Sequence, residues 1–337
     1  MPSKIESGTP TTRQVNAYLT ATHDDPPAQD GVIFLAQGEY SLNFLIRSES
    51  RDLVARLVTG SQIGLLLAEQ AVYEHKALEL LAASGVTPKP YLVDSEPTGL
   101  PYPVILEEYL PGRPLDYSTD LRAAARCIGA IHNLSVPDHH HLQVHPDPAP
   151  AILRESHSLA TPYLEWAEAS NESKAALRRG FKRIKEFLKD DGLFTGDDLA
   201  IVNYDLNTHN FVAENGEVKL LDWEKARIAP RTQDLAHFLL PTTTLWRDDT
   251  ATLLTEQQER DFIKEYLQPA PASDTTRFHI QLEAMRTIVS LRAVSWCAWA
   301  LQESAQSTRH ITNEETLNKC RHYLDPEFLQ HLFAEAE

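Results

Sequence analysis

The sequence predicts an α+β protein with two lobes: a small lobe built on an antiparallel β-sheet, and a larger, mostly helical lobe. Residues 31–58 alternate apolar and polar positions and are rich in β-branched and aromatic residues, which is typical of antiparallel strands. Segments after residue 118 instead repeat apolar residues at helical spacing. We therefore expect a polar segment over residues 1–30, a first lobe over 31–110 and a helical second lobe over 111–337.

The first lobe is expected to contain five short strands. The polar residues before it predict a short leading helix or a loose tail. Gly38 and the polar run SESRD divide residues 31–58 into three strands, because turn-forming residues interrupt the alternation. Two shorter strands follow in PYLVD and YPVILEEY, at residues 90–94 and 102–109. The segment LPGRPL at 110–115 then ends the lobe.

One helix is predicted inside this lobe, over residues 68–85. Val72, Leu78 and Leu81 recur there at helical spacing. Gly85 is a suitable stop, because glycine readily adopts the left-handed conformation with which many helices end.

The second lobe is predicted to be helical apart from one group of strands. Ser118 or Thr119 is expected to cap a helix over residues 119–134, since a hydroxyl oxygen can accept from the open N–H groups of a first turn. A polar segment at 137–150 is expected to be a loop. Further helices are predicted at residues 173–191, 285–301 and 325–333, and strands between residues 200 and 223.

Composition and charge restrict the classes of partner. The hydrophobic fraction of 42% is enough for a globular interior, and the formal net charge is -17. This charge disfavours non-specific binding to nucleic acid or to an anionic membrane surface, because both need a positive field. An acidic surface that keeps the protein soluble explains the charge most simply, and a cationic substrate is the alternative.

The cysteines and the first residues indicate a soluble, cytoplasmic protein. Cys127, Cys297 and Cys320 lie far apart and form no CxxC pair, so the sequence predicts neither a disulfide framework nor a zinc site. The first residues have no apolar core of a secretory signal. No apolar run approaches the roughly 18 residues of a membrane helix. The oligomeric state does not follow from the sequence.

An Asn-Gly pair is expected to bring three oxygen-bearing side chains to one place. Asn215 and Gly216 stand between two apolar runs and favour a type I′ hairpin, because both central positions of that turn need positive φ. Folding the chain there places Asn210 and Asp222 at the open end of the ribbon, where Asp205 also enters. In a strict two-residue hairpin Asn210 and Asp222 would face opposite sides, so the pairing must end or bulge before Asn210.

Two carboxylates and an amide carbonyl suit a magnesium ion that keeps positions for water and phosphate oxygens. The spacing Asp-x-x-x-x-Asn, with a later Asp after an apolar strand, is that of a phosphoryl-transfer loop. The spacing alone is weak, but together with the hairpin and LLDWE it is more specific. The alternative is that Asp205 and Asn210 are turn residues that cap backbone groups.

A set of motifs follows one another in a specific order over roughly residues 31–245. They are LAQGEYSLNFLIR, LVARLVTGSQ, VYEHKALELL, VILEEYLPGRPL, LRAAARCIGAIHNL, NYDLNTHNFV, LLDWEKA and QDLAHFL. The set resembles the aminoglycoside phosphotransferase and choline kinase-like family, whose members are relatives of protein kinases. The resemblance implies a two-lobed, protein kinase-like fold with ATP in the cleft between the lobes.

The resemblance also implies roles for residues of the catalytic loop and the hairpin. Asp205 would be the catalytic base that orients and deprotonates the substrate hydroxyl. Asn210 and Asp222 would hold Mg²⁺ against the phosphates of ATP. Asp234, in QDLAHFL, would be a structural residue that ties the catalytic loop in place.

Nucleotide contacts are implied for the first lobe. Gly38 and Ser41, in QGEYS, would belong to the loop that covers the phosphates. Arg56 stands where the family places a Lys or Arg on the third strand, and Glu74 would be its partner on the helix. The backbone groups expected to contact the adenine are those of Glu108 and Leu110.

The chain departs from the family pattern directly ahead of Asp205. The family usually has His-Gly where this chain has Asn203 and Tyr204. The His supports the loop through hydrogen bonds, which an Asn side chain can replace. A Tyr in place of Gly is bulkier and is expected to alter the shape of the loop or of the substrate pocket.

Two functions from different classes follow. The first is a small-molecule kinase that transfers the γ-phosphoryl group of ATP to a hydroxyl of an amino sugar, an amino alcohol or a sugar. The second is a nucleotide-binding regulator with little turnover, which the Asn203-Tyr204 replacement motivates. A protein kinase is disfavoured, because the stretch between Asp222 and Asp234 is too short for an activation segment.

Three further features have simpler interpretations. The histidines at 139–145 lie in a Pro- and Asp-rich segment and are expected to form a solvated loop rather than a metal site. Trp296 and Trp299 lie on one predicted helix and are expected to be core residues rather than pocket residues. Glu224 is either a contact to a cationic substrate or a surface acid.

Overall fold

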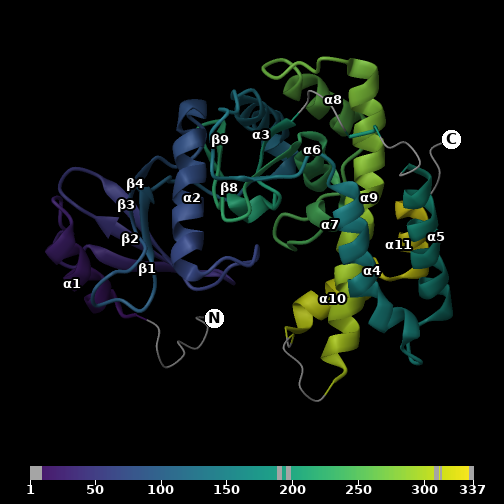
Figure 1. Ribbon diagram of the computed structural model, residues 1–337, viewed down its shortest axis with the longest axis horizontal. Helices are drawn as coiled ribbons and strands as arrows, with labels where there is room; N and C mark the ends of the chain where they lie inside the picture. Colours follow the sequence, from purple (N-terminus) through teal and green to yellow (C-terminus); the bar gives the residue numbers. More distant parts are fainter. Residues whose placement is uncertain (1–9, 188–191, 195–198, 307–310, 312, 334–337) are drawn as a thin grey trace. The chain divides into compact units, whose positions relative to one another are not determined.

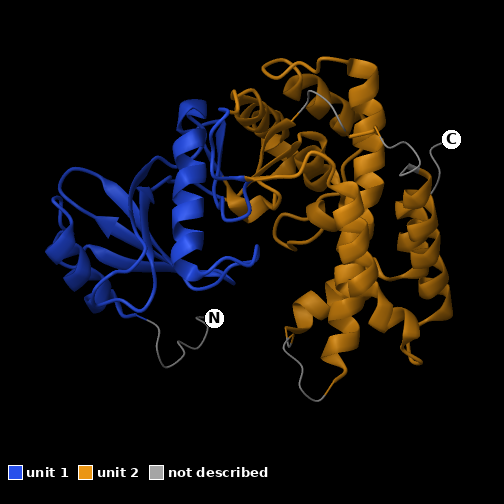
Figure 2. Cartoon of the chain, viewed as in Figure 1, with its two compact units in different colours: residues 1–113, 137–142, 212–226 blue, residues 114–136, 143–211, 227–337 orange. Residues whose placement is uncertain are grey.

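The computed structural model describes residues 10–187, 192–194, 199–306, 311 and 313–333. Figure 2 shows the chain divided into two compact units. Unit 1 comprises residues 1–113, 137–142 and 212–226, and unit 2 comprises residues 114–136, 143–211 and 227–337. Two short later segments of the chain thus return to unit 1.

Unit 1 contains a five-stranded antiparallel sheet, with strand order β1-β2-β3-β5-β4 (Figure 1). The elements of this unit are α1 (Thr12–Thr22), β1 (Val32–Gln37), β2 (Ser41–Arg47), β3 (Asp52–Val58), α2 (Leu67–Leu81), β4 (Pro90–Asp94), β5 (Val104–Glu108), β8 (Phe211–Glu214) and β9 (Glu217–Leu220). The predicted sheet is confirmed, including the two short strands that follow α2. The residues before it do form a short leading helix, α1.

The two faces of the sheet carry different side chains, because successive residues of a strand point to opposite faces. Leu53 and Leu57 of β3 belong to an apolar core that also contains Leu19 of α1. Arg56 of the same strand points to the other face, where its guanidinium forms an ion pair with Glu74 of α2. The period of the strand therefore separates a dry apolar face from a face that carries charge.

The helix α2 ends as the sequence predicts. A short 3-10 turn, Ala82–Ser84, follows it, and Gly85 then adopts the left-handed conformation with a φ of 71°. The Gly85 N–H donates to the Ala82 carbonyl at 3.3 Å. A residue with a Cβ atom is strained in this conformation, which explains the use of glycine.

The predicted Asn-Gly hairpin is formed by β8 and β9. Asn215 and Gly216 both have positive φ, at 53° and 83°, as a type I′ turn requires. Backbone hydrogen bonds attach the hairpin to unit 1: the Leu220 N–H donates to the Val86 carbonyl at 2.8 Å. The predicted joint LPGRPL contributes as well, because Arg113 forms an antiparallel bridge with Ala213.

Unit 2 is mostly helical, and its long helix α9 packs against α4, α5, α6 and α10 (Figure 1). Its elements are α3 (Tyr117–His132), β6 (Gln143–Val144), α4 (Ala149–Glu165), α5 (Asn171–Phe187), β7 (Leu199–Val202), β10 (Arg227–Pro230), α6 (Thr232–Leu239), α7 (Pro241–Thr244), α8 (Glu256–Tyr266), α9 (Thr275–Ser304), α10 (Glu314–Tyr323) and α11 (Pro326–Leu332). In the described part of the chain, no helix has both the length and the apolar composition needed to cross a membrane.

A small sheet in unit 2 was not expected in full. Its strand order is β6-β10-β7, and β10 pairs antiparallel with β7 and parallel with β6. The sequence predicts strands only as far as residue 223, so it misses β10. All residues of β10 are buried, so this short strand lacks the alternation that identifies a half-exposed one.

The predicted cap of α3 is wrong. The helix begins at Tyr117, and its cap is Asp116, whose Oδ1 accepts the Ser118 N–H at 2.8 Å. Aspartate caps a helix as well as serine does, so the motif alone left several candidate starting points. The helix α4 was also not predicted; it begins inside the segment expected to be a loop.

The tight approach at Gly112 generates a stability prediction. Its φ is 141°, and a Cβ atom added there would lie 2.5 Å from Val212 Cγ1 and 2.7 Å from the Ala213 carbonyl oxygen. We expect Gly112→Ala to lower the free energy of unfolding by about 2–4 kcal/mol, because an unfavourable φ and a clash with backbone combine. Urea unfolding measures the loss.

Gly99→Ala is the matched control, since Gly99 also has a positive φ, 93°, but has open space around its Cβ position. It is expected to cost only about 1 kcal/mol. Equal losses for the two variants would show that the contact between Gly112 and the hairpin contributes nothing.

Candidate active site

The turn that follows β7 carries Asp205. Asn203 is fully buried, and Tyr204 has a φ of 75°, which is unusual for a residue with a side chain. The Asn203 side-chain oxygen Oδ1 accepts the N–H of Asp205 at 3.0 Å. An Asn that bonds to the backbone two residues later forms a tight local turn. The turn therefore ends the strand and presents Asp205 at its tip.

The carboxylate of Asp234 accepts hydrogen bonds from the backbone of this turn. It lies in the first turn of α6 and is almost completely buried. Its Oδ2 accepts the Asn203 N–H at 2.8 Å, and its Oδ1 accepts the Tyr204 N–H at 2.9 Å. Hydrogen bonds to an ionised acceptor are stronger than neutral ones. Both backbone amides ahead of Asp205 are thus fixed by a single side chain.

His132, which the sequence analysis did not single out, completes this support. Its Nε2 lies 3.3 Å from Asp234 Oδ2, and its Nδ1 lies 3.0 Å from the Tyr266 hydroxyl. His132 is the last residue of α3 and is buried. A polar residue on the apolar side of the helix predicted over residues 119–134 was the available signal, because buried polar side chains need partners.

The loop from Asp205 to Asn210 closes on itself. The carbonyl oxygen of Asp205 accepts the Asn207 N–H at 3.0 Å and the Asn210 Nδ2–H at 2.8 Å. With Nδ2 engaged in that bond, Oδ1 is the atom with which Asn210 can bind a cation. The five-residue spacing between Asp205 and Asn210 therefore lets the Asn210 side chain bond back to the Asp205 backbone, in addition to placing an acid and an amide close together.

The ring of Tyr204 lies against two arginines. The Arg227 guanidinium is 3.8 Å from the ring centroid, and that of Arg292, on α9, is 5.4 Å away. Both distances are within the range of cation–π attraction. These contacts offset the strain of a tyrosine in the left-handed conformation. The Tyr that replaces the expected Gly is therefore accommodated by its own partners.

In unit 1, Arg56 stands at the centre of a cluster of acids. Its Nε lies 2.9 Å from Glu74 Oε1, and its Nη2 lies 2.8 Å from Asp222 Oδ1 and 3.1 Å from Glu224 Oε2. Arg56 and Glu74 are buried, whereas 31% of the Asp222 side chain is exposed. The planar fork of Arg suits several carboxylates at once. The cluster thus joins β3, α2 and the segment after β9.

Burial and crowding of like charges perturb these acids. Burial opposes the charge of Arg56, but Asp222, Glu74 and Glu224 outweigh it and raise the pKa of Arg56. Burial raises the pKa of Glu74 to about 8 against the opposing effect of Arg56. Burial, with repulsion from Asp222, raises the pKa of Glu224 to about 8, and burial raises that of Glu107 to about 7. The single positive charge of Arg56 is therefore shared among Glu74, Asp222 and Glu224 and cannot neutralise all three.

Glu224 is not a surface acid, which corrects one of its two sequence interpretations. It is buried, its Oε1 accepts from Gln62 Nε2 at 3.2 Å, and its backbone carbonyl accepts from Gln70 Nε2 at 2.9 Å. Together with its bond to Arg56, these contacts make Glu224 a structural part of the acidic cluster.

The remaining residues expected to contact a nucleotide lie at strand ends of unit 1. Gly38 begins the short turn between β1 and β2, where its N–H donates to the Ser41 carbonyl at 2.9 Å. A Cβ atom at Gly38 would lie 3.2 Å from Ser41 Oγ, so glycine keeps this turn narrow. Glu108 ends β5 and its N–H donates to Lys89, so its carbonyl is the group that a ligand would use. Leu110 is buried two residues later.

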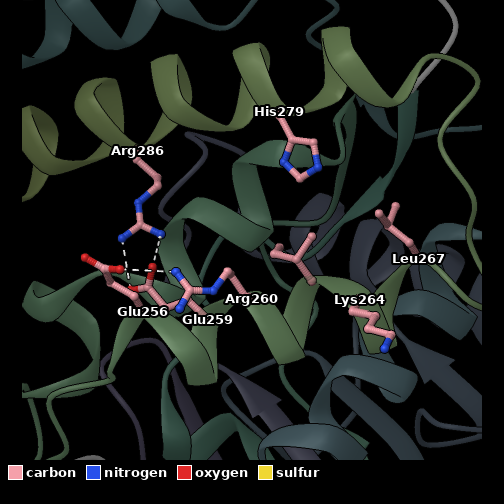
Figure 3. A pocket seen from close by; sticks show the side chains of 8 residues that line it. Glu256, Glu259, Arg260, Lys264, Leu267, His279 and Arg286 are labelled. Carbon is pink, nitrogen blue, oxygen red and sulfur yellow. Dashed lines mark hydrogen bonds and ion pairs between the residues drawn. The ribbon is translucent and has the colours of Figure 1, made fainter. Parts of the chain in front are cut away.

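Unit 2 also contains a surface pocket of about 490 Å³ (Figure 3). It is lined by residues of α8 and α9, and Arg286 forms two hydrogen bonds to Glu259 there, at 2.8 and 3.0 Å. No residue predicted to bind substrate or nucleotide lines it. Elsewhere in unit 2, Trp296 is half-buried, and its ring packs edge-on against that of Trp246 with 5.9 Å between the ring centroids.

Comparison with known proteins identifies relatives. Residues 31–273 match the model of a family described as the phosphotransferase enzyme family. A spectinomycin phosphotransferase, solved with ADP and spectinomycin, has a TM-score of 0.67 and 14% identity, covering 95% of this chain and 97% of that chain. Among curated proteins, no sequence matches significantly.

Two further solved structures have the same fold. The ethanolamine kinase of Plasmodium vivax has a TM-score of 0.59 and 14% identity, covering 91% of this chain and 84% of that chain. A macrolide 2′-phosphotransferase from Brachybacterium faecium has a TM-score of 0.62 and 16% identity, covering 94% and 98%. The predicted kinase-like fold is confirmed by these similarities.

The contacts of Tyr204 predict a graded response to substitution. Tyr204→Phe should keep the free energy of unfolding within about 0.5 kcal/mol, because the ring stays beside the arginines. Tyr204→Ala should lose about 1–2 kcal/mol, because the strained φ remains and the ring contact disappears. Tyr204→Gly should fall between them, since glycine removes the strain. Chemical denaturation that finds Phe as damaging as Ala would contradict this account.

Proposed function

Because this chain belongs to the phosphotransferase enzyme family, we propose that it transfers the γ-phosphoryl group of ATP to a hydroxyl group of a small molecule, with Mg²⁺ bound. The observation that carries the proposal is the fixed presentation of Asp205. Asp234 binds both preceding amides, and Asn203 and Asn210 bond to the backbone of Asp205 itself. A catalytic group held this firmly reduces the entropic cost of reaching the transition state.

Asp205 is the proposed base. Its carboxylate would accept the hydrogen bond of the acceptor hydroxyl, orient the oxygen towards the phosphorus and take the proton as the bond forms. Its backbone N–H and carbonyl are engaged by Asn203 and Asn210, and the carboxylate is the group that we assign to the substrate. Asn203 supports this role directly, because it bonds to the Asp205 N–H in place of the histidine usual in the family.

Asp222 and Asn210 are the proposed ligands of Mg²⁺, which would neutralise negative charge on the phosphates. Their donor chemistry fits: a carboxylate and an amide oxygen are hard ligands, and Mg²⁺ keeps several positions for water and phosphate. The Asp222 side chain is 31% exposed, so it can be reached. The excess of acids around Arg56 also fits a site that receives a cation. In the described residues, no group of three or more His, Cys, Asp or Glu forms an all-protein metal cage.

Arg56 and Glu74 are the proposed pair on the nucleotide side. The ion pair fixes the guanidinium, which would bind phosphate oxygens as Arg does elsewhere. Gly38 and Ser41 would form the narrow turn over the phosphates, and the Glu108 carbonyl and the Leu110 backbone would contact the adenine. Two neighbours support the small-molecule acceptor: one was solved with ADP and spectinomycin, and another is an ethanolamine kinase.

Asp205→Asn should abolish transfer and spare nucleotide binding. We expect kcat to fall by about 10²–10⁴-fold, the range for loss of a general base. ATP consumption with a panel of hydroxyl-bearing metabolites measures turnover, and titration with Mg-ATP measures binding. Asp248→Asn is the matched control, because Asp248 is an exposed acid of the same unit that pairs with Lys319. It should behave as wild type.

The outcomes separate the two functions. A wild type that binds Mg-ATP yet never outpaces Asp205→Asn on any acceptor would be a nucleotide-binding regulator. A wild type that does not bind ATP would contradict both functions.

A further inference from the structure

Arg292 brings a positive charge beside the proposed base. It lies near the middle of α9, and its guanidinium is 5.4 Å from the ring of Tyr204, the residue directly before Asp205. Its side chain is 34% exposed, so solvent and a ligand can reach it. The sequence analysis did not single out Arg292, because it lies 87 positions after Asp205 in the chain.

The guanidinium of Arg292 has donors to spare. Its Nε–H donates to Glu155 Oε2 of α4 at 3.0 Å, and across the described parts of the chain this is its one hydrogen bond. A guanidinium carries five N–H donors in a planar fork. The ion pair with Glu155 therefore fixes the side chain while the Nη groups stay available for a further acceptor.

Two arginines lie against the ring of Tyr204, although the chain has a formal net charge of -17. Arg227 and Arg292 thus place positive charge among the acids Asp205, Glu155 and Asp234. Burial lowers the pKa of Arg292, and Tyr204, Glu155 and Asp205 together raise it above its ordinary value. Arg292 is thus charged at neutral pH.

We propose that Arg292 binds an anionic group of the phosphoryl acceptor, so that the acceptor is a hydroxyl compound with a carboxylate or a similar acid. The inference rests on the proposed function, because it takes the acceptor hydroxyl to lie at Asp205. A planar guanidinium and a carboxylate form charge-assisted, often bidentate hydrogen bonds. The same charge repels an amine, so it selects against cationic acceptors. A cationic acceptor, which the net charge had left open, is thereby disfavoured.

A purely structural role for Arg292 makes different predictions. An ion pair that only ties α4 to α9 would affect stability and leave acceptor choice unchanged. The test must therefore measure how binding depends on the charge of the ligand, in addition to the stability of the fold.

The experiment uses three matched sets of hydroxyl compounds, which differ mainly in charge. The acids are glucuronate, lactate and para-hydroxyphenylacetate. Their neutral counterparts are glucose, propylene glycol and tyrosol, and their amines are glucosamine, isopropanolamine and tyramine. Binding to the full-length chain is followed by calorimetric titration at constant ionic strength, which needs no turnover.

Wild type should bind at least one acid about 10-fold or more tightly than its neutral and amine counterparts, as expected for a charge-assisted hydrogen bond. Arg292→Gln should lose this preference, and Arg292→Lys should keep part of it. Arg260→Gln is the matched control, since Arg260 is an exposed arginine of the same unit that also pairs with a glutamate. Circular dichroism of each variant confirms that it folds.

Turnover gives a second reading. With Mg-ATP, the acid that binds should be phosphorylated, and Arg292→Gln should raise its KM by about 10-fold or more with a smaller change in kcat. The inference is overturned if wild type shows no preference for acids, or if Arg292→Gln keeps that preference. A protein that binds acids through Arg292 but neither binds nor consumes ATP would instead contradict the proposed function.

Discussion

The carboxylate of Asp234 is the constraint on which the candidate active site depends. It accepts the backbone N–H groups of Asn203 and Tyr204 and lies beside His132, and the side chains of Asp234, Asn203 and His132 are all buried. A buried carboxylate without such partners would be costly, so the bonds are required by its burial as much as by the turn. The same bonds hold the turn in which Tyr204 keeps its strained conformation. These hydrogen bonds to Asp234 therefore fix the position of Asp205, the next residue in the chain.

The two units distribute charge in opposite ways. In unit 1, a single guanidinium, that of Arg56, is shared by Glu74, Asp222 and Glu224, and the excess of acid suits the arrival of a cation. In unit 2, two arginines, Arg227 and Arg292, lie against the ring of the residue that precedes Asp205. A phosphotransferase needs positive charge for phosphates and a suitable environment for its acceptor. The arginines beside Tyr204 are the feature from which we infer the charge of the acceptor, because the fold alone does not specify it.

The sequence predicted the strands and the hairpin of unit 1, because these elements are specified by residues that lie close together in the chain. Alternation identified the strands of unit 1, and the positive φ values of Asn215 and Gly216 follow from the Asn-Gly turn. The buried strand β10 and the support of His132 were missed, because both depend on partners distant in the chain. The proximity of Tyr204 and Arg292 is of the same kind: no short motif records that α9 passes the turn after β7. The departure at Asn203-Tyr204 was visible, but only the contacts explain how it is tolerated.

Amide hydrogen exchange at Asn203 and Tyr204 tests the central claim most directly. If Asp234 holds both N–H groups, they should exchange only through openings that cost at least about 4 kcal/mol. In Asp234→Ala both should lose most of this protection, while the amide of Ala200 in β7, which pairs with Ala229 of β10, should keep its own. Fast exchange of the Asn203 and Tyr204 amides in the wild type, at the rate of an unstructured chain, would contradict the account.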